Sequence, residues 1–243
     1  MMDDKGFTFY DWFSERPRTR LGLKRRARIE EFKFQRLKKY IPSGALMLEI
    51  GPGEGRFAEL CRREGIRYFC IEPSPPLQKR LNEEGYPTIG GFVPPIAVKS
   101  QSIDVLYADQ LLEHMPDFNA AAHFIAESRR VLKNDGHLVL IFPNYLKEKE
   151  FFFDIDYSHN FITTERRVEQ MLFDCRFTPV DKVFSIGCTT GILRYLIKAT
   201  TFFLGWGITA HIFRIFKAGD FLSRLRKNLF ETIMVIARKE QGR

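Results

Sequence analysis

The chain has 243 residues, of which 44% are hydrophobic and 28% are charged, a composition that suits one globular domain with appended segments and excludes a wholly disordered chain. Its net charge of +8 favours anionic partners such as an acidic membrane surface, nucleic acid or phosphorylated substrates. The four cysteines include no C-x-x-C pair, which excludes a disulfide-rich scaffold and a cysteine zinc site.

The first 44 residues predict a basic helical extension. The opening sequence MMDDKGFTFYDWF has no basic start followed by a long apolar run, so we expect no secretory signal and a cytoplasmic location. Eleven Arg or Lys residues against two acids lie between Arg16 and Lys39. Apolar residues recur there at roughly helical spacing and predict an amphipathic helix over about 26–40. Because no recognised nucleic-acid-binding motif accompanies these charges, we expect a solvated or lipid-facing helix.

From residue 45 onward, short apolar runs alternate with helical stretches. The segments predicted as strands are 46–50, 67–71, 88–89, 103–108, 137–142, 179–185 and 232–237. The predicted helices cover about 55–64, 75–84, 117–132 and 164–173. Near-continuous apolar strands such as LVLIF suit a parallel sheet that is covered on both faces. The alternation therefore predicts a doubly wound α/β sheet.

Residues 187–229 interrupt this pattern, because they are far too many for an ordinary connection. They are apolar and aromatic, and they hold seven Lys or Arg residues and one acid. Their longest uncharged run, Ala199–Phe213, has fifteen residues, fewer than the ~20 that a spanning helix needs. We predict a helical insert, and two interpretations stay open: a lid over the acceptor pocket, or an interfacial contact with an anionic membrane.

The main chemical signal is Glu49-Ile50-Gly51-Pro52-Gly53-Glu54-Gly55, which follows a predicted strand and precedes a predicted helix. Glycines allow a sharp turn and a close approach of the backbone to a ligand, and the helix N-terminus offers free N–H groups. Glu72 follows the next strand about 20 residues further on, where a carboxylate can accept hydrogen bonds from both hydroxyls of a ribose.

These motifs continue as IDVLYADQLLEHMPD and RRVLKNDGHLVLIFPN. In this order they resemble the class I S-adenosylmethionine-dependent methyltransferases, and in particular those acting on small molecules, quinones, lipids and sugars. The resemblance covers about residues 45–183 and the final strand. It implies a Rossmann-like, mostly parallel seven-stranded sheet, formed by a core of residues 45–186 and a last strand within 230–243, on either side of the helical insert at 187–229. It also implies S-adenosylmethionine as the cofactor.

The resemblance assigns roles by position. The segment Glu49–Gly55 would hold the methionine part, Glu72 the ribose, and the residues just past the fourth strand the sulfonium region. Many relatives have an acid near the adenine, where this chain has Gly90-Gly91-Phe92-Val93, so adenine would rely on backbone contact and apolar packing. The predicted cofactor-binding residues are Glu49, Gly51, Pro52, Gly53, Gly55, Glu72, Pro73, Gly91, Phe92, Asp109, Gln110 and Leu111.

Three residues are candidates for work on the acceptor. His159 lies in the loop after the fifth strand, where an imidazole could act as a base or orient the acceptor, and Tyr157 is its nearest rival. His114 is the third, with hydrogen bonding near a helix start as its alternative role. Similar quinone O-methyltransferases carry E-x-x-E-H, which can hold a divalent ion, but Gln110 stands at the first position here. We therefore expect no metal.

The sequence thus predicts a methyltransferase that acts on an O or N atom of an apolar, lipid-linked or saccharide acceptor, working in the cytoplasm or peripherally on its membrane. Two alternatives remain: an enzyme for a soluble metabolite or RNA, and a cofactor-binding scaffold without turnover. Because a motif such as N-P-P-Y is absent past the fourth strand, we expect no nucleic-acid partner. The sequence does not indicate an oligomeric state.

Overall fold

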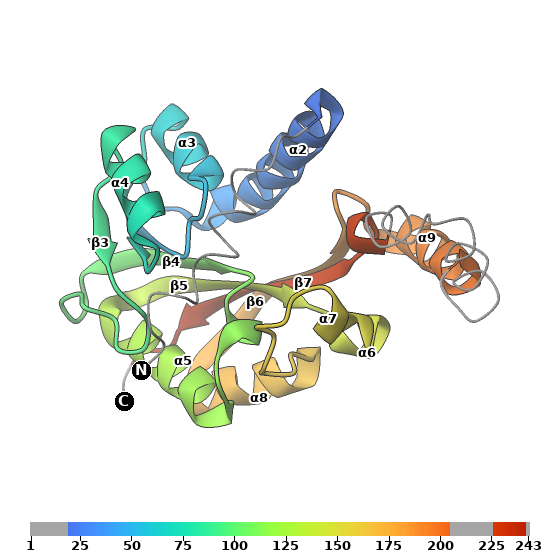
Figure 1. The fold of residues 1–243 in the computed structure, drawn as a ribbon. Coiled ribbons are helices and arrows are strands. Elements are labelled where there is room, and N and C mark those ends of the chain that lie inside the picture. Colours follow the sequence, from blue (N-terminus) through green and yellow to red (C-terminus); the bar gives the residue numbers. More distant parts are fainter. Residues whose placement is uncertain (1–18, 205–225, 242–243) are drawn as a thin grey trace.

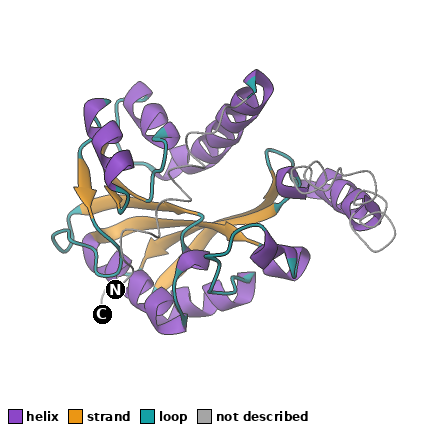
Figure 2. Ribbon diagram, in the orientation of Figure 1, coloured by secondary structure: helices purple, strands orange, loops and turns teal. Residues whose placement is uncertain are grey.

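The computed structural model describes residues 19–204 and 226–241. Within them, seven strands form one sheet in the order β3-β2-β1-β4-β5-β7-β6, with helices on both sides (Figure 2). The strands are β1 (Leu46–Ile50), β2 (Arg67–Glu72), β3 (Thr88–Gly90), β4 (Ile103–Asp109), β5 (Leu132–Pro143), β6 (Phe177–Ile186) and β7 (Glu231–Lys239). Only β7 runs antiparallel to its neighbours. The predicted mostly parallel, Rossmann-like sheet is confirmed.

Helices cover the two faces of the sheet, with α2, α3 and α4 on one side and α5 and α8 on the other (Figure 1). Because neighbouring strand residues point to opposite faces, Met47 packs with the α2–α3 layer and Leu48 with the α5–α8 layer. The helical elements are α2 (Arg20–Leu37), η2 (Lys38–Tyr40), α3 (Arg56–Arg63), α4 (Pro75–Glu83), η3 (Leu112–His114), α5 (Phe118–Val131), α6 (Tyr145–Glu148), α7 (Phe151–Asp154), α8 (Glu165–Asp174) and α9 (Gly191–Leu204).

Several predicted boundaries were wrong. Helix α2 starts at Arg20 instead of about residue 26, because the Thr19 side chain caps it by accepting the N–H of Gly22 at 3.1 Å. Its predicted last turn, residues 38–40, is a 3₁₀ helix. Strand β5 begins at Leu132, five residues early, through an irregular pairing with β4. The short helices α6 and α7 were not predicted, because four residues are too few to show a helical period.

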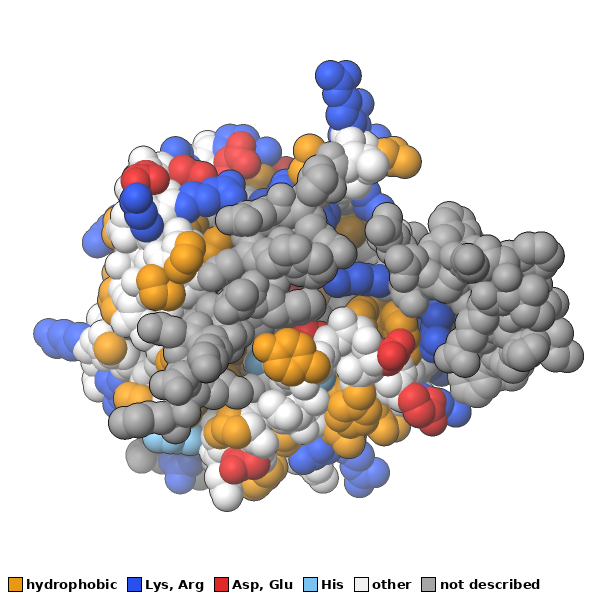
Figure 3. Space-filling view, viewed as in Figure 1, with side chains coloured by type: hydrophobic (Ala, Val, Ile, Leu, Met, Phe, Trp, Pro, Cys, Tyr) orange, Lys and Arg blue, Asp and Glu red, His pale blue; other side chains and the backbone are white. Residues whose placement is uncertain are grey.

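The described part of the insert begins with α9, which extends from the sheet edge where β6 ends and β7 starts (Figure 1). The uncharged run predicted at 199–213 continues beyond Leu204, and its remainder lies outside the described residues. No described helix is long and apolar enough to cross a membrane. Lys and Arg side chains project at the outer end of α2 (Figure 3), as expected for the basic extension.

Candidate functional site

The glycine segment forms the turn from β1 into α3, at the carboxyl edge of the parallel strands. Gly51 has a φ of +69° and Gly55 one of +72°, in the left-handed region that favours glycine. A Cβ built on Gly51 would meet no atom within 4 Å. The space beside Gly51 is therefore open to a ligand, as the sequence predicted for a cofactor loop.

Glu72 stands at the end of β2, beside this turn. Its carboxylate accepts the N–H of Gly53 at 3.2 Å and the N–H of Ser74 at 3.0 Å, and the residue is only 5% exposed. Strands β1 and β2 pair in parallel, with Ile50 opposite Ile71, so both strands end at the same place. The predicted ribose-binding carboxylate thus lies against the glycine loop and holds its backbone.

Glu49 is a buried carboxyl group at the end of β1. The hydroxyl of Tyr68 donates to it at 2.5 Å. Burial raises the pKa of Glu49 to about 8, and the hydrogen bond from Tyr68 opposes this rise only in part. At neutral pH the group is therefore mostly protonated, and a nearby positive charge would favour its ionisation.

Helix α2 supplies a cation to the site, a contribution that the sequence did not reveal. Lys33 pairs with Asp109 at the end of β4 and with Glu30 at 3.0 Å. Burial opposes the charge of Lys33, but Asp109 and Glu30 outweigh it and raise the pKa of the amine above its ordinary value. Asp109, predicted to line the sulfonium region, is thus tied to the N-terminal helix. The apolar periodicity predicted that helix, but not the contact between Lys33 and Asp109.

Two histidines from separate loops meet at the other end of the site. The rings of His114, in η3, and His159, in the loop after α7, have centroids 4.9 Å apart. His114 Nδ1 lies 2.8 Å from the hydroxyl of Ser158, and His159 Nδ1 lies 2.6 Å from the carbonyl oxygen of Phe152. Glu113 is fully buried beside them. The sequence predicted both histidines as candidates, but it did not predict that they lie side by side.

The protonation of this cluster follows from its burial. Burial lowers the pKa of His114 to about 4, and His159 adds to the effect. Burial also lowers the pKa of His159, with the charge of Lys227 acting in the same direction. Burial raises the pKa of the Glu113 carboxyl well above its ordinary value. Both imidazoles are therefore neutral near pH 7 and can act as bases or ligands.

A single cleft of about 730 Å³ joins the two ends of the site and has α2 as one wall. Of the predicted residues, it is lined by Glu49, Gly51, Pro52, Gly53, Asp109, Gln110, His114 and His159. Phe92 is 61% exposed and Tyr157 is 64% exposed, and neither belongs to this lining, nor do Gly55, Glu72, Pro73, Gly91 and Leu111. Residues not singled out from the sequence complete it, among them Arg25, Asp156 and Lys227.

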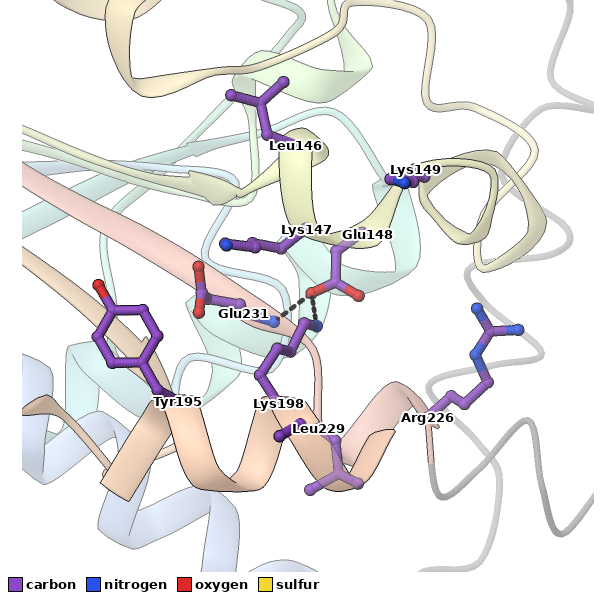
Figure 4. A pocket seen from close by; sticks show the side chains of 10 residues that line it. Leu146, Lys147, Glu148, Lys149, Tyr195, Lys198, Arg226, Leu229 and Glu231 are labelled. Atoms are coloured by element: carbon purple, nitrogen blue, oxygen red, sulfur yellow. Dashed lines mark hydrogen bonds and ion pairs between the residues drawn. The ribbon is translucent and has the colours of Figure 1, made fainter. Parts of the chain in front are cut away.

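A second cavity of about 430 Å³ lies between α6, α9 and the start of β7. Glu148 accepts the N–H of Glu231 at 2.8 Å and pairs with Lys198 (Figure 4). Glu231, 1% exposed, also faces Arg194 of α9 at 3.3 Å. Arg194 and Lys198 thus attach the described part of the insert to β7 and to α6 through buried ion pairs.

Comparisons with known proteins agree with this geometry. Residues 22–161, more than half of the chain, match a family model described as a methyltransferase domain. An uncharacterized methyltransferase of Mycobacterium leprae is 28% identical over 109 residues, covering 43% of this chain. The chain spans 39% of the length of that relative.

Two solved structures show the same fold. A methyltransferase from Archaeoglobus fulgidus that depends on S-adenosylmethionine has a TM-score of 0.60 and 18% identity, over 86% of this chain and 94% of that one. A geranyl diphosphate methyltransferase in complex with S-adenosylmethionine has a TM-score of 0.61 and 14% identity, over 88% and 85%.

Proposed function

This chain belongs to the class I S-adenosylmethionine-dependent methyltransferases, and we propose that it methylates an O or N atom of an apolar, lipid-linked or saccharide acceptor. The observation that carries the proposal is the shared cleft, which has the glycine loop at one end and two neutral imidazoles at the other. A cofactor on the loop and an acceptor at the imidazoles would meet inside one enclosure.

The cofactor residues act by position in this proposal. The loop Gly51–Gly55 takes the methionine part, with its ammonium near Glu49, and Glu72 takes the ribose hydroxyls. Asp109, Gln110 and Leu111 line the sulfonium region. Pro73, Gly91 and Phe92 surround adenine. The parallel pairing of Glu72 with Gly90 supports this arrangement, because the adenine residues then follow directly beside the ribose carboxylate.

The acceptor lies on the histidine side of the cleft. Its nucleophilic atom attacks the methyl carbon, the bond from carbon to sulfur breaks, and the electron pair stays on sulfur to give S-adenosylhomocysteine. His159 orients the reacting atom or accepts its proton, with Tyr157 and His114 as the other candidates. Alignment of the two reactants supplies much of the rate in such a transfer.

Apolar side chains support an apolar acceptor. Ile29 of α2, Ile155 and Phe230 line the cleft, together with the cations Arg25 and Lys227. Such a wall favours burial of an apolar body, and the two cations favour an anionic or strongly polar group at its end. A soluble metabolite or RNA would gain less from the apolar wall.

Transfer is tested by incubating the protein with labelled S-adenosylmethionine and a panel of lipid extracts, saccharides and small phenols. We expect label in an apolar or lipid-linked fraction, and loss of that label in His159→Ala while affinity for S-adenosylhomocysteine persists. Unchanged turnover of His159→Ala would remove His159 from the reaction. Cofactor binding without transfer to any acceptor would instead favour the scaffold alternative.

Contact with the membrane is proposed for the basic α2 and the insert, and co-sedimentation with anionic vesicles tests it. The matched variant replaces residues 205–225 by a Gly-Ser linker, because this change keeps the pairs of Arg194 and Lys198 with β7 and α6. We expect the whole chain to sediment and the variant to sediment less. If neither form sediments, the membrane contact is rejected.

A further inference from the structure

Glu113 is a buried acid whose carboxyl oxygens accept no hydrogen bond from the described residues. Its side chain is 0% exposed, and neither carboxyl oxygen has a hydrogen-bond partner among the described residues. A buried carboxyl group without partners costs several kcal/mol unless a proton or a cation compensates it. One carboxyl oxygen nevertheless lies within 4.8 Å of a ring nitrogen of His114 and of His159, which also lie within 4.8 Å of each other.

The hydrogen bonds of the two rings fix which nitrogen carries the proton. The carbonyl oxygen of Phe152 can only accept, so His159 Nδ1 carries hydrogen. The Ser158 hydroxyl donates to Asp156 at 2.7 Å and therefore accepts from His114 Nδ1. In both rings Nε2 is then the nitrogen with the lone pair. Metal-binding histidines characteristically donate the other ring N–H to a carbonyl or a carboxylate-linked group in this way.

We propose that Glu113, His114 and His159 together bind a divalent transition-metal cation at the acceptor end of the cleft. This inference rests on the proposed function, and it selects the orienting role for His159. Two imidazoles and one carboxylate suit zinc, cobalt, manganese or iron(II) better than magnesium or calcium, which prefer oxygen ligands alone.

This ligand set differs from the E-x-x-E-H pattern that led us to expect no metal. Gln110 does replace the first acid of that pattern, but His159 approaches from another loop and supplies a third ligand. In tetrahedral zinc sites the ligand atoms stand roughly 3.4 Å apart. The ligand atoms of the three side chains lie within 4.8 Å of one another, so they need to close by at most about 1.4 Å, which side-chain rotation supplies.

The cation gives the acceptor a defined chemistry. Three protein ligands leave a coordination position open for an acceptor hydroxyl, and a divalent cation lowers the pKa of such a group. The hydroxyl passes its proton to solvent water. Its oxygen then forms the new bond to the methyl carbon as the bond from sulfur to that carbon breaks. The inference therefore favours a hydroxyl acceptor and an O-methyl product over an amine.

Binding of Co²⁺ to the untagged, chelator-stripped full chain tests the site directly, because cobalt reports its ligands by visible absorption. We expect one Co²⁺ per chain, displaced by Zn²⁺, and at least tenfold weaker binding in His159→Ala and in the near-isosteric Glu113→Gln. The matched control is His123→Ala, since His123 is an exposed residue of α5 outside the cluster, and this variant should bind Co²⁺ as the parent does.

Thermal unfolding checks that each variant folds, and Glu113→Gln keeps the test valid if His159→Ala does not. Absence of Co²⁺ binding at millimolar concentration, or equal binding in parent and Glu113→Gln, overturns the proposal. Calorimetry with S-adenosylhomocysteine separates the two hypotheses. If the cofactor binds and methyl transfer continues in the presence of a chelator, only the metal site is refuted. If the cofactor does not bind, the proposed function is refuted, and cobalt absorption still tests the metal site.

Discussion

Cofactor binding should release a proton from Glu49. Burial raises the pKa of this carboxyl to about 8 in the free protein, so about 0.9 of the molecules carry the proton at pH 7. The ammonium of S-adenosylhomocysteine beside Glu49 favours the ionised carboxylate. Ionising it at pH 7 costs about 1.4 kcal/mol, because one pKa unit equals 1.36 kcal/mol. Affinity at pH 7 should therefore be roughly tenfold below its value with Glu49 fully ionised.

Calorimetry at pH 7 in two buffers of different ionisation enthalpy measures this proton. We expect release of close to one proton per bound cofactor in the parent chain and almost none in Glu49→Gln. Affinity should rise between pH 6 and pH 8 in the parent and stay flat in the variant. Tyr68→Phe is the matched control, because it removes the hydrogen bond to Glu49 and keeps the carboxyl. Tight binding without proton release in the parent would refute the assigned position of the ammonium.

The same shift has a signature in stability. The folded-state pKa of Glu49 lies above the ordinary value of 4.5, so the folded protein binds this proton more tightly than the unfolded chain does. The resulting stability is complete below about pH 4.5 and is lost as pH rises through about 8. The melting temperature of the free protein should therefore fall between pH 6 and pH 8.5, and by less in Glu49→Gln.

Further predictions concern the walls of the cofactor site. Lys33→Ala leaves Asp109 without its cation and should lower the free energy of unfolding by about 3 kcal/mol. Urea unfolding of Lys33→Ala and of Lys33→Arg measures this difference. Equal free energies of unfolding for the two variants would show that the ion pair contributes nothing. Gly51→Ala adds a methyl group in open space and should cost affinity for S-adenosylhomocysteine more than stability. Gly55→Ala should do the reverse, because its Cβ would lie 2.8 Å from Leu81; similar melting temperatures for both variants would contradict this distinction.

Much of the fold could be predicted because its signals are local. A buried parallel strand needs an unbroken apolar run, and six of the strands are found within two residues of the predicted starts. Strand β5 is the exception, because polar residues such as Lys133 and Asp135 begin it. The start of α2 was missed because its first apolar residues, Leu21 and Leu23, are exposed and the predicted helical period begins only near Ile29, although Thr19 is a residue type that commonly caps helices.

The site also has a part that could be predicted from the sequence and a part that could not. Glu49, Gly51 and Glu72 follow strands, and the topology of a parallel sheet brings strand ends together, so their proximity follows from sequence order. The contact of His159 with His114 depends on the path of a loop through α6 and α7, which no period or spacing encodes. The contact of Lys33 with Asp109 depends on how α2 packs against the rest of the fold, which is a matter of tertiary structure.

Three acids in or beside the cleft, two of them buried, differ in what neutralises their charge. Asp109 has its cation within the chain, in Lys33. Glu49 remains largely protonated, and in the proposed function the ammonium of the cofactor meets it. Glu113 has no partner among the described residues, and in the further inference a metal ion meets it. The cofactor should therefore release the proton of Glu49, and because burial raises the pKa of Glu113, a metal ion should favour the ionised form of that acid. Proton release that is additive for the two ligands, and abolished separately by Glu49→Gln and Glu113→Gln, would establish that the two acids act independently.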